Sequence, residues 1–306
     1  MAGNFDVVVI AGPTASGKTG AGIGLAAALN GEIVSADARQ IYRYMDVGTA
    51  KATAEEQKKA VHHLIDIVDP DAHYSAGRWA EDSHRVISDM IARGKVPILV
   101  GGAGLYLKAL FDGFAPIPEI PEGIRTSLEA VATQDVSRLF SRLLEVDPAW
   151  AEKIQPADKQ RIVRGLEVYE TTGKTLTQFQ NLPREPAGGH WRTRWFALGW
   201  PRDVLYERIN GRALEMVQQG LVKEVEGLLE RGYTAGMNAL KTFGYREILD
   251  HLSGTLSLEE AISDLQKGSR NYAKRQLTWF RGEARMTWIQ AGERDAAAEI
   301  LTQLEA

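Results

Sequence analysis

Residues 7–19 read Val-Val-Val-Ile-Ala-Gly-Pro-Thr-Ala-Ser-Gly-Lys-Thr, and this stretch decides the fold. Gly12, Gly17, Lys18 and Thr19 occupy the fixed positions of the phosphate-binding pattern G-x-x-x-x-G-K-[ST]. An apolar, β-branched run precedes the loop, and the Ala- and Leu-rich run over residues 18–29 is typical of a helix. A strand, a glycine loop and a helix in this order predict a phosphate site beside a parallel sheet.

The predicted phosphate-binding loop, called the P-loop below, comprises Gly12, Pro13, Thr14, Ala15, Ser16, Gly17, Lys18 and Thr19. Its glycines allow successive backbone N–H groups to point into one concavity, where Lys18 adds a positive charge. The Thr19 hydroxyl is suited to a Mg²⁺ ion shared with the phosphate oxygens. The motif indicates a phosphate ligand and leaves the reaction open, and a chance match in a glycine-rich turn is the alternative.

The composition excludes several classes of site. The chain has 306 residues and no cysteine, which excludes disulfides, thiolate zinc sites, iron–sulfur clusters and a cysteine nucleophile. We find no signal-peptide pattern and no apolar run of bilayer length, and therefore expect a cytoplasmic protein that does not enter a membrane. The net charge of −4 is not that of a strongly basic nucleic-acid-binding protein, so any RNA contact needs a local basic surface.

Asp37 follows a second predicted strand over residues 32–36. The carboxyl ends of parallel strands meet at one edge of a sheet, so Asp37 should face the same crevice as the P-loop. Further strands are predicted over 63–68 and 96–100. The second of these ends in Gly101-Gly102-Ala103-Gly104, where a P-loop NTPase usually has a metal-holding acid, and we interpret the glycines as a close approach of the backbone to a ligand.

The chain changes character after the proline-punctuated segment 115–121, because residues 122–180 show only helical patterns. The segment 181–189 marks a second boundary, after which residues 195–200 and 286–289 are predicted strands. The remaining predicted helices cover residues 75–93, 105–110, 202–219, 221–231, 258–268, 270–281 and 294–305. We predict an α/β, P-loop NTPase-like core with a parallel sheet (residues 1–120 and 190–306) and an inserted all-helical domain (residues 121–189).

Several basic residues allow two interpretations. Arg161 and Arg164 share one face of a predicted helix that is either solvated or an RNA contact. Arg208 and Arg212 could either reach an anion together or pair with nearby glutamates. The basic and aromatic run 270–281 fits a nucleic-acid backbone or plain solvation. The adjacent histidines at 62 and 63 have no partner at metal-ligand spacing, and we expect them to be structural.

Six blocks together resemble the tRNA dimethylallyltransferase (isopentenyl-tRNA transferase) family, in its bacterial type. They are Gly-Pro-Thr-Ala-Ser-Gly-Lys-Thr (12–19), Ser-Ala-Asp-Ala-Arg-Gln-Ile-Tyr (35–42), Asp-Val-Gly-Thr-Ala-Lys (46–51), Gly-Gly-Ala-Gly-Leu-Tyr (101–106), Arg-Ile-Val-Arg-Gly-Leu-Glu-Val-Tyr (161–169) and Tyr-Ala-Lys-Arg-Gln-Leu-Thr-Trp (272–279). The blocks occur in family order over nearly the whole chain, which makes the resemblance far more specific than a P-loop alone.

The resemblance implies transfer of a dimethylallyl group from dimethylallyl diphosphate to N6 of the adenosine 3′ of the tRNA anticodon. It implies Asp37 as general base, Lys18, Thr19 and Arg212 as groups that stabilise the diphosphate, and a Mg²⁺ ion held in part by Thr19. It also implies a monomer that binds the anticodon stem-loop. The tRNA-binding residues it implies are Asp37, Ala38, Arg39, Gln40, Ala103, Arg125, Gln160, Arg161, Ile162, Val163 and Arg164.

The chain departs from the family pattern at three positions. Ala38 and Ala103 stand where the family usually has serine and threonine, so two hydroxyls are missing. In the family the threonine lies near the reacting centre, so its replacement by Ala103 removes one RNA or substrate contact. Tyr44 stands where the family usually has glycine. The cysteine-free tail lacks the zinc finger of eukaryotic relatives. The acid and the P-loop are intact.

Two other functions fit parts of the sequence. A small-molecule or nucleoside kinase would use the P-loop for ATP, but it needs a metal-holding acid that the predicted strand over 96–100 does not supply. A catalytically silent RNA-binding protein would keep the P-loop as a phosphate grip, but it would not need Asp37, Lys18 and Thr19 together.

Overall fold

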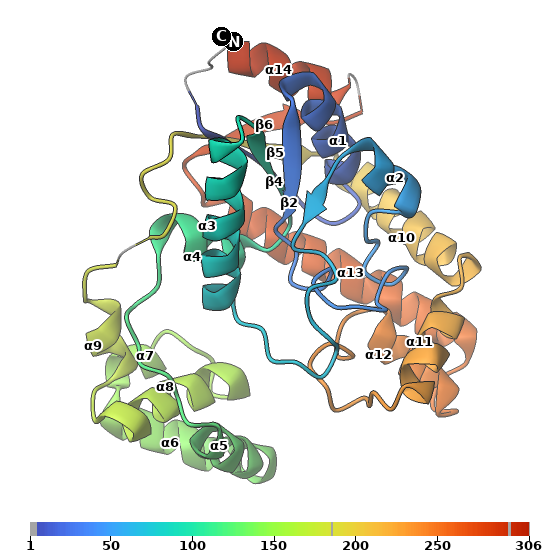
Figure 1. Ribbon diagram of the computed structural model, residues 1–306. Helices are drawn as coiled ribbons and strands as arrows, with labels where there is room; N and C mark the ends of the chain where they lie inside the picture. The colour runs from blue at the N-terminus through green and yellow to red at the C-terminus, as the bar shows by residue number, and fades with distance from the viewer. Residues whose placement is uncertain (1–4, 185, 293–294, 306) are drawn as a thin grey trace. The chain divides into compact units, whose positions relative to one another are not determined.

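The computed structural model describes residues 5–184, 186–292 and 295–305 (Figure 1). Its centre is a six-stranded parallel sheet in the order β3-β2-β4-β1-β5-β6, which confirms the predicted α/β fold. The strands are β1 (Val7–Ala11), β2 (Gly31–Ser35), β3 (His62–His63), β4 (Val96–Gly101), β5 (Thr193–Gly199) and β6 (Met286–Gln290).

Helices cover both faces of the sheet, because the central strands are apolar on both sides. Val8 and Ile10 of β1 belong to a core that includes residues of α1 and α14, whereas Val7 and Val9 belong to the core on the opposite face. The helices of this α/β unit are α1 (Lys18–Leu29), α2 (Ala54–Lys59), α3 (Ala76–Ala92), α4 (Gly104–Asp112), α10 (Arg202–Gln218), α11 (Leu221–Glu230), α12 (Tyr245–Leu252), α13 (Leu258–Arg281) and α14 (Ala296–Glu305).

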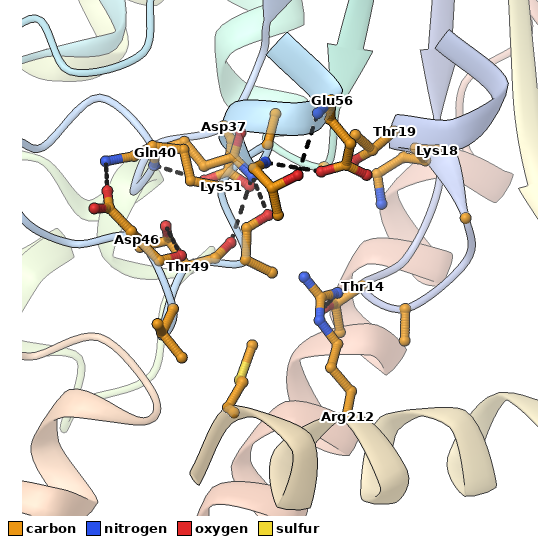
Figure 2. Close-up of a pocket in the computed structure, with 18 of the residues that line it drawn as sticks. Thr14, Lys18, Thr19, Asp37, Gln40, Asp46, Thr49, Lys51, Glu56 and Arg212 are labelled. Carbon is orange, nitrogen blue, oxygen red and sulfur yellow. Dashed lines mark hydrogen bonds and ion pairs between the residues drawn. The ribbon is translucent and has the colours of Figure 1, made fainter. Parts of the chain in front are cut away.

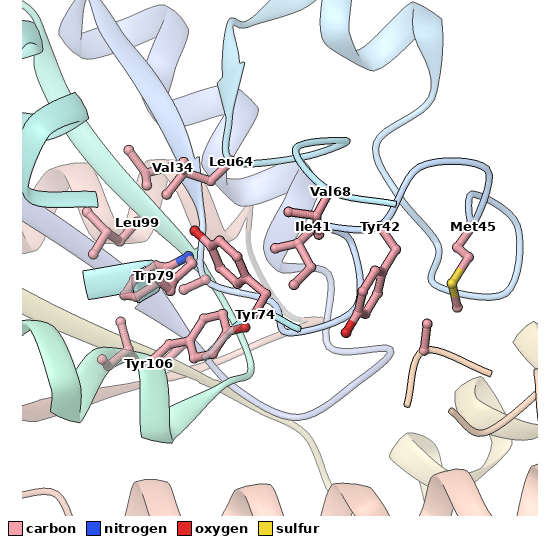
Figure 3. Packing of buried hydrophobic residues seen from close by; sticks show 14 of the residues in the cluster. Val34, Ile41, Tyr42, Met45, Leu64, Val68, Tyr74, Trp79, Leu99 and Tyr106 are labelled. Carbon is pink, nitrogen blue, oxygen red and sulfur yellow. The ribbon is translucent and has the colours of Figure 1, made fainter. Parts of the chain in front are cut away.

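Trp79 of α3 anchors the end of β2. Its ring is fully buried, and 4.8 Å separate its centroid from that of Tyr106 of α4. Figure 3 shows the two rings side by side. Its indole Nε1 donates to the backbone oxygen of Ser35, at 3.0 Å. Ser35 is the last residue of β2, so this hydrogen bond steadies the backbone two residues before Asp37.

Residues 112–186 form a separate compact helical unit, and residues 1–111 together with 187–306 form the α/β unit. The predicted division had placed residues 112–120 in the core. In the structure Ala115, Ile117 and Ile120 pack against a buried cluster around Val168 and Phe179, so the connector belongs to the helical unit. The helices of this unit are α5 (Glu122–Gln134), α6 (Val136–Val146), α7 (Pro148–Ala151), α8 (Lys159–Thr172) and α9 (Leu176–Gln180).

Two predicted elements were wrong. The expected break at Gly268 does not occur, because α13 runs unbroken from Leu258 to Arg281. A Cβ at Gly268 would lie 2.6 Å from the Phe243 ring, so this glycine permits close packing within the helix. The expected strand over 63–68 is reduced to His62–His63, because Leu64 and Asp66 have left-handed backbone angles (φ 59° and 54°) that end the extended chain.

Among the described residues, no helix is long and apolar enough to cross a membrane.

Candidate active site

A pocket lies at the carboxyl ends of β1, β2 and β4 (Figure 2), the edge of the sheet where the sequence placed the site. The P-loop forms one wall, Asp37 and Gln40 after β2 form another, and residues of α10 and α13 complete it. Every lining residue belongs to the α/β unit. The structure therefore brings together Lys18, Thr19 and Arg212 with Asp37, as predicted.

The P-loop has the backbone that its glycines were expected to provide. Gly12 and Gly17 have φ of 143° and 93°, and the strand ends and α1 begins on either side of them. The Lys18 ammonium donates to the backbone oxygen of Pro13 at 2.6 Å. Burial, reinforced by the positive charge of Arg212, lowers the pKa of Lys18 to about 7. An anion in the pocket would oppose this shift by favouring the charged ammonium.

Two arginine side chains from α10 donate hydrogen bonds to the P-loop. Figure 2 shows Arg212 reaching from α10 toward Thr14, whose Oγ1 accepts from Arg212 Nη1 at 3.2 Å. Arg208 Nε donates to the backbone oxygen of Ala15 at 2.9 Å, and its guanidinium lies 4.4 Å from the Trp200 ring centroid.

These contacts argue against the interpretation that this arginine pair forms ion pairs with nearby glutamates. Both side chains turn toward the P-loop, and the described residues include no ion pair from Arg208 or Arg212 to Glu207 or Glu215. Burial lowers the pKa of Arg212, but a guanidinium still stays charged at neutral pH. Two fixed cations therefore accompany the ionisable Lys18 at this wall.

Asp37 is oriented by its own turn. Its Oδ1 accepts hydrogen bonds from the backbone N–H groups of Arg39 (2.8 Å) and Gln40 (3.3 Å). No described residue donates to the other carboxylate oxygen, and Asp37 lines the pocket. One oxygen is thus fixed by the backbone, and the second is available to a substrate proton.

Arg39 and Gln40 brace this turn from two sides. Arg39 Nη1 donates to the backbone oxygen of Asn238 at 2.9 Å. The Gln40 amide accepts from Ser35 Oγ at 3.1 Å and donates to the backbone oxygen of Ala50 at 3.2 Å. Ala38 is half-buried and packs against the core on this side of the sheet.

The glycines at the end of β4 line the pocket, and protein atoms also lie close to both of them. Their close approach to a ligand stays a prediction. A Cβ at Gly101 would lie 2.0 Å from the backbone oxygen of Ala36, and one at Gly102 would lie 2.1 Å from Gln276 Nε2. The neighbours that exclude a side chain are therefore protein atoms. Ala103 N donates to the same Ala36 oxygen at 3.0 Å, which holds the β4 turn against the residue before Asp37.

The loop over residues 45–51 contributes a wall whose construction the sequence did not reveal. The Glu224 carboxylate accepts from the backbone N–H groups of three consecutive residues, Asp46 to Gly48, at 2.7–3.1 Å. Lys51 is buried, and its ammonium contacts Asp46 and Asp66, each at 2.5 Å. Because Glu224 lies far along the chain, only the fold brings it to this loop.

Comparisons with known proteins show which family the chain resembles. The family model described as IPP transferase matches residues 40–283, and the one described as Isopentenyl transferase matches residues 5–72. The tRNA dimethylallyltransferase 1 of Syntrophotalea carbinolica is 45% identical over 288 residues, which cover 93% of this chain and 91% of the relative. The chain belongs to the tRNA dimethylallyltransferase family.

Solved structures with similar names also resemble this chain in their three-dimensional fold. The full-length tRNA isopentenylpyrophosphate transferase of Bacillus halodurans is 39% identical with a TM-score of 0.72, covering 99% of this chain and 95% of that one. A eukaryotic dimethylallyltransferase, described as acting on tRNA, is 28% identical with a TM-score of 0.78, covering 94% of this chain and 74% of that one.

The tRNA-binding residues expected from the family in the helical unit divide into exposed and buried groups. Ile162 and Val163 are 0% and 5% exposed and pack in the core of this unit, so their side chains serve packing. Gln160 and Arg161 are exposed, and Arg161 forms an i,i+3 ion pair with Asp158 at 2.9 Å.

Arg125 and Arg164 share one buried carboxylate. Glu167 is fully buried and forms ion pairs with Arg125 and Arg164 at 2.8 and 2.7 Å. Burial opposes ionisation of Glu167, but the two arginines outweigh it and hold its pKa below the ordinary value. Both guanidiniums are still more than a third exposed, so this carboxylate positions two cations at the surface of the unit.

The donor set of the pocket suits a Mg²⁺ ion that arrives with a phosphate ligand. Thr19 lines the pocket, and no described residue forms a hydrogen bond with its hydroxyl. The described residues contain no group of three or more His, Cys, Asp or Glu side chains that could hold a metal. Mg²⁺ commonly takes one or two protein ligands together with phosphate oxygens and water, so the residues present fit such an ion.

The two adjacent histidines have structural partners, as expected. His62 Nδ1 lies 2.8 Å from the backbone oxygen of Ala60, and His63 Nε2 lies 2.7 Å from the Glu32 carboxylate. That carboxylate also pairs with Arg93 at 2.7 Å.

Proposed function

We propose that this protein transfers a dimethylallyl group from dimethylallyl diphosphate to N6 of the adenosine 3′ of the tRNA anticodon. One observation carries the proposal: an oriented carboxylate, Asp37, shares a pocket with a P-loop whose neighbouring strand β4 ends in glycines. A phosphate cradle is thus combined with a proton acceptor, and the end of β4 offers no metal-holding acid. Family membership supports the same reaction.

The reaction balances within this pocket. The bond between N6 and the prenyl C1 forms, the C1–O bond to diphosphate breaks, and the proton lost by N6 passes to the free oxygen of Asp37. Negative charge that develops on the leaving diphosphate is stabilised by Lys18, Arg212 and the backbone N–H groups of the P-loop. The dimethylallyl group leaves the enzyme on the RNA, and diphosphate is the second product.

Thr19 would hold a Mg²⁺ ion together with oxygens of the diphosphate. When bound, this ion supplies positive charge that offsets the charge of the leaving group. The hydroxyl of Thr19 lies at the start of α1, so backbone N–H groups of the helix terminus and the ion would act on the same phosphate group.

Contacts to tRNA are proposed for both units. In the α/β unit, Asp37, Ala38, Arg39, Gln40 and Ala103 would contact the nucleotide that is turned out of its stack. In the helical unit, Gln160, Arg161, Arg164 and Arg125 would contact the anticodon stem-loop through phosphates. The protein would act on tRNA as a monomer in the cytoplasm.

Ligand-dependent thermal stability tests this proposal against its rivals. Because a ligand stabilises the state that binds it, dimethylallyl diphosphate with Mg²⁺ should raise the Tm and ATP with Mg²⁺ should not. A shift with ATP alone would support a kinase, and the absence of a shift with either ligand would support a silent RNA-binding protein. Either result would contradict the proposed transferase.

A further inference from the structure

Gln276 joins the two catalytic walls of the pocket. It lies on α13, is 6% exposed, and lines the pocket beside the P-loop and the β4 turn. Its Oε1 accepts from the backbone N–H of Thr14 at 2.8 Å, and its Nε2 donates to the backbone oxygen of Gly102 at 3.0 Å. A single side chain therefore bridges the phosphate cradle and the turn that follows β4.

The bridge requires a side chain that accepts at one atom and donates at another, as an amide does. A backbone N–H only donates and a carbonyl only accepts, so the two partners fix which end of the Gln276 amide faces each of them. A Cβ at Gly102 would lie 2.1 Å from Nε2, which shows how closely the β4 turn approaches this side chain. Gln276 shares a helical stripe with buried Ala273 and Phe280, so a polar group stands where the pattern of α13 calls for an apolar one.

We propose that Gln276 is a positioning residue that sets the distance between the diphosphate cradle and the edge that receives the base. This inference rests on the proposed function. The β4 turn is tied to Ala36 through the Ala103 N–H, and Ala36 precedes Asp37. A chain of hydrogen bonds thus runs from Thr14 through Gln276 and the β4 turn to the residue beside the general base.

The bridge should affect the chemical step more than the binding of either substrate. Each substrate has its own partners, phosphate on the P-loop and base near Asp37, so each should bind without Gln276. The two reacting atoms would then be misplaced, and a displacement of about 1 Å can cost about 10²-fold in rate. We expect Gln276→Met to lower kcat by about 10–10²-fold, with each KM changed only a few-fold.

Gln276→Glu gives a signature that loss of packing cannot produce. A protonated carboxyl can accept from Thr14 N–H and donate to the Gly102 oxygen, whereas a carboxylate cannot donate. The kcat of this variant relative to the unaltered protein should rise as pH falls, and the Gln276→Met deficit should stay constant with pH. Repulsion between the carboxylate of this variant and the diphosphate would instead raise the KM for dimethylallyl diphosphate.

The experiment measures kcat and both KM values across pH for the unaltered protein, both Gln276 variants and Gln266→Met. Gln266 lies on the same helix and donates to the backbone oxygen of Asn210 at 3.1 Å, so it controls for loss of a helix–backbone bond. An unchanged kcat in Gln276→Met, or a deficit equal to that of Gln266→Met, would overturn the inference.

A second readout does not depend on activity. Hydrogen exchange at the Thr14 amide should be protected in the unaltered protein and in Gln266→Met, and fast in Gln276→Met. Equal protection in all three proteins would also overturn the inference. If the unaltered protein transferred no prenyl group, the proposed function would fail, and the exchange of the Thr14 amide would still decide whether the bridge exists.

Discussion

At the scale of single residues, the pocket pairs one oriented carboxylate with an ionisable ammonium and a fixed guanidinium. Asp37 is held by two backbone N–H groups, and Arg212 is held near Thr14. Lys18 differs from the fixed guanidinium because burial lowers its pKa to about 7, so its charge depends on what occupies the pocket. The division fits a reaction in which a proton and an anionic leaving group depart on opposite sides.

Asp37→Asn should reduce kcat by about 10²–10⁴-fold, because a positioned proton acceptor contributes about that much. Asparagine keeps an oxygen for the Arg39 N–H, so the turn and tRNA affinity should survive. Steady-state transfer and tRNA binding measured on the same preparation check this. Asp69→Asn is the matched control, because Asp69 pairs with half-exposed Arg43 and does not line the pocket. Full turnover in Asp37→Asn would remove this residue from the mechanism.

Binding of diphosphate should take up a proton above pH 7. Above pH 7 the side-chain amine of Lys18 is largely neutral, because burial lowers its pKa to about 7. A bound anion raises that pKa again. Affinity for inorganic diphosphate with Mg²⁺ should therefore fall as pH rises through 7. Calorimetry at pH 8 in two buffers of different ionisation enthalpy measures the uptake, and Lys18→Met should abolish it. Identical proton uptake in that variant would assign the titration to another group.

The motif and the strand pattern predicted the pocket residues whose role is local, and the family resemblance added Arg212 of α10. Lys18, Thr19 and Asp37 lie at strand and loop ends, where the motif and the strand pattern place them. Gln276 lines the pocket only because the fold places α13 there, and Glu224 of α11 holds the loop over residues 45–51 by accepting from its backbone N–H groups. Gln276 lies in the family block over residues 272–279, but no role was predicted for it, and its polar side chain on the buried stripe of α13 was the signal that could have indicated one.

At the scale of elements, the sequence predicted most of the strands and long helices, but it divided α13 in two, extended β3 too far and missed two short helices. The helix α2 buries none of its residues, so it has no apolar stripe, although Thr53 and Glu56 form a capping box that marks its start. The helix α12 has only eight residues and begins after Gly244. Short elements of this kind depend on tertiary packing, which a periodic pattern does not contain.

The prediction for tRNA binding concerns the exposed face of α8. Arg161 is 61% exposed, and its surface ion pair with Asp158 contributes little, so it can exchange that partner for a phosphate. Arg161→Ala should weaken tRNA binding and lower the salt slope by about 1. Filter binding over a salt series measures both quantities. Arg142→Ala, which breaks an exposed ion pair with Glu170, is the control. An unaltered salt slope in Arg161→Ala would show that Arg161 is only a solvated surface residue and does not contact tRNA.

At the scale of the whole molecule, the parallel sheet gathers loops that are far apart in the chain into one pocket, and a second unit is inserted between α4 and β5. The fold class followed from the P-loop and the strand pattern. The boundary near residue 112 did not, because the proline-rich connector looks like a linker in sequence but packs its apolar residues into the helical unit.

Transfer of radiolabelled dimethylallyl from its diphosphate to unmodified tRNA, with and without Mg²⁺, tests the central claim most directly. We predict Mg²⁺-dependent label on N6 of the adenosine 3′ of the anticodon, lost in Asp37→Asn and retained in Asp69→Asn. If tRNA binds but acquires no label, the account is contradicted. A separate assay of ATP hydrolysis would then distinguish a kinase, which hydrolyses ATP, from a silent RNA-binding protein, which leaves it intact.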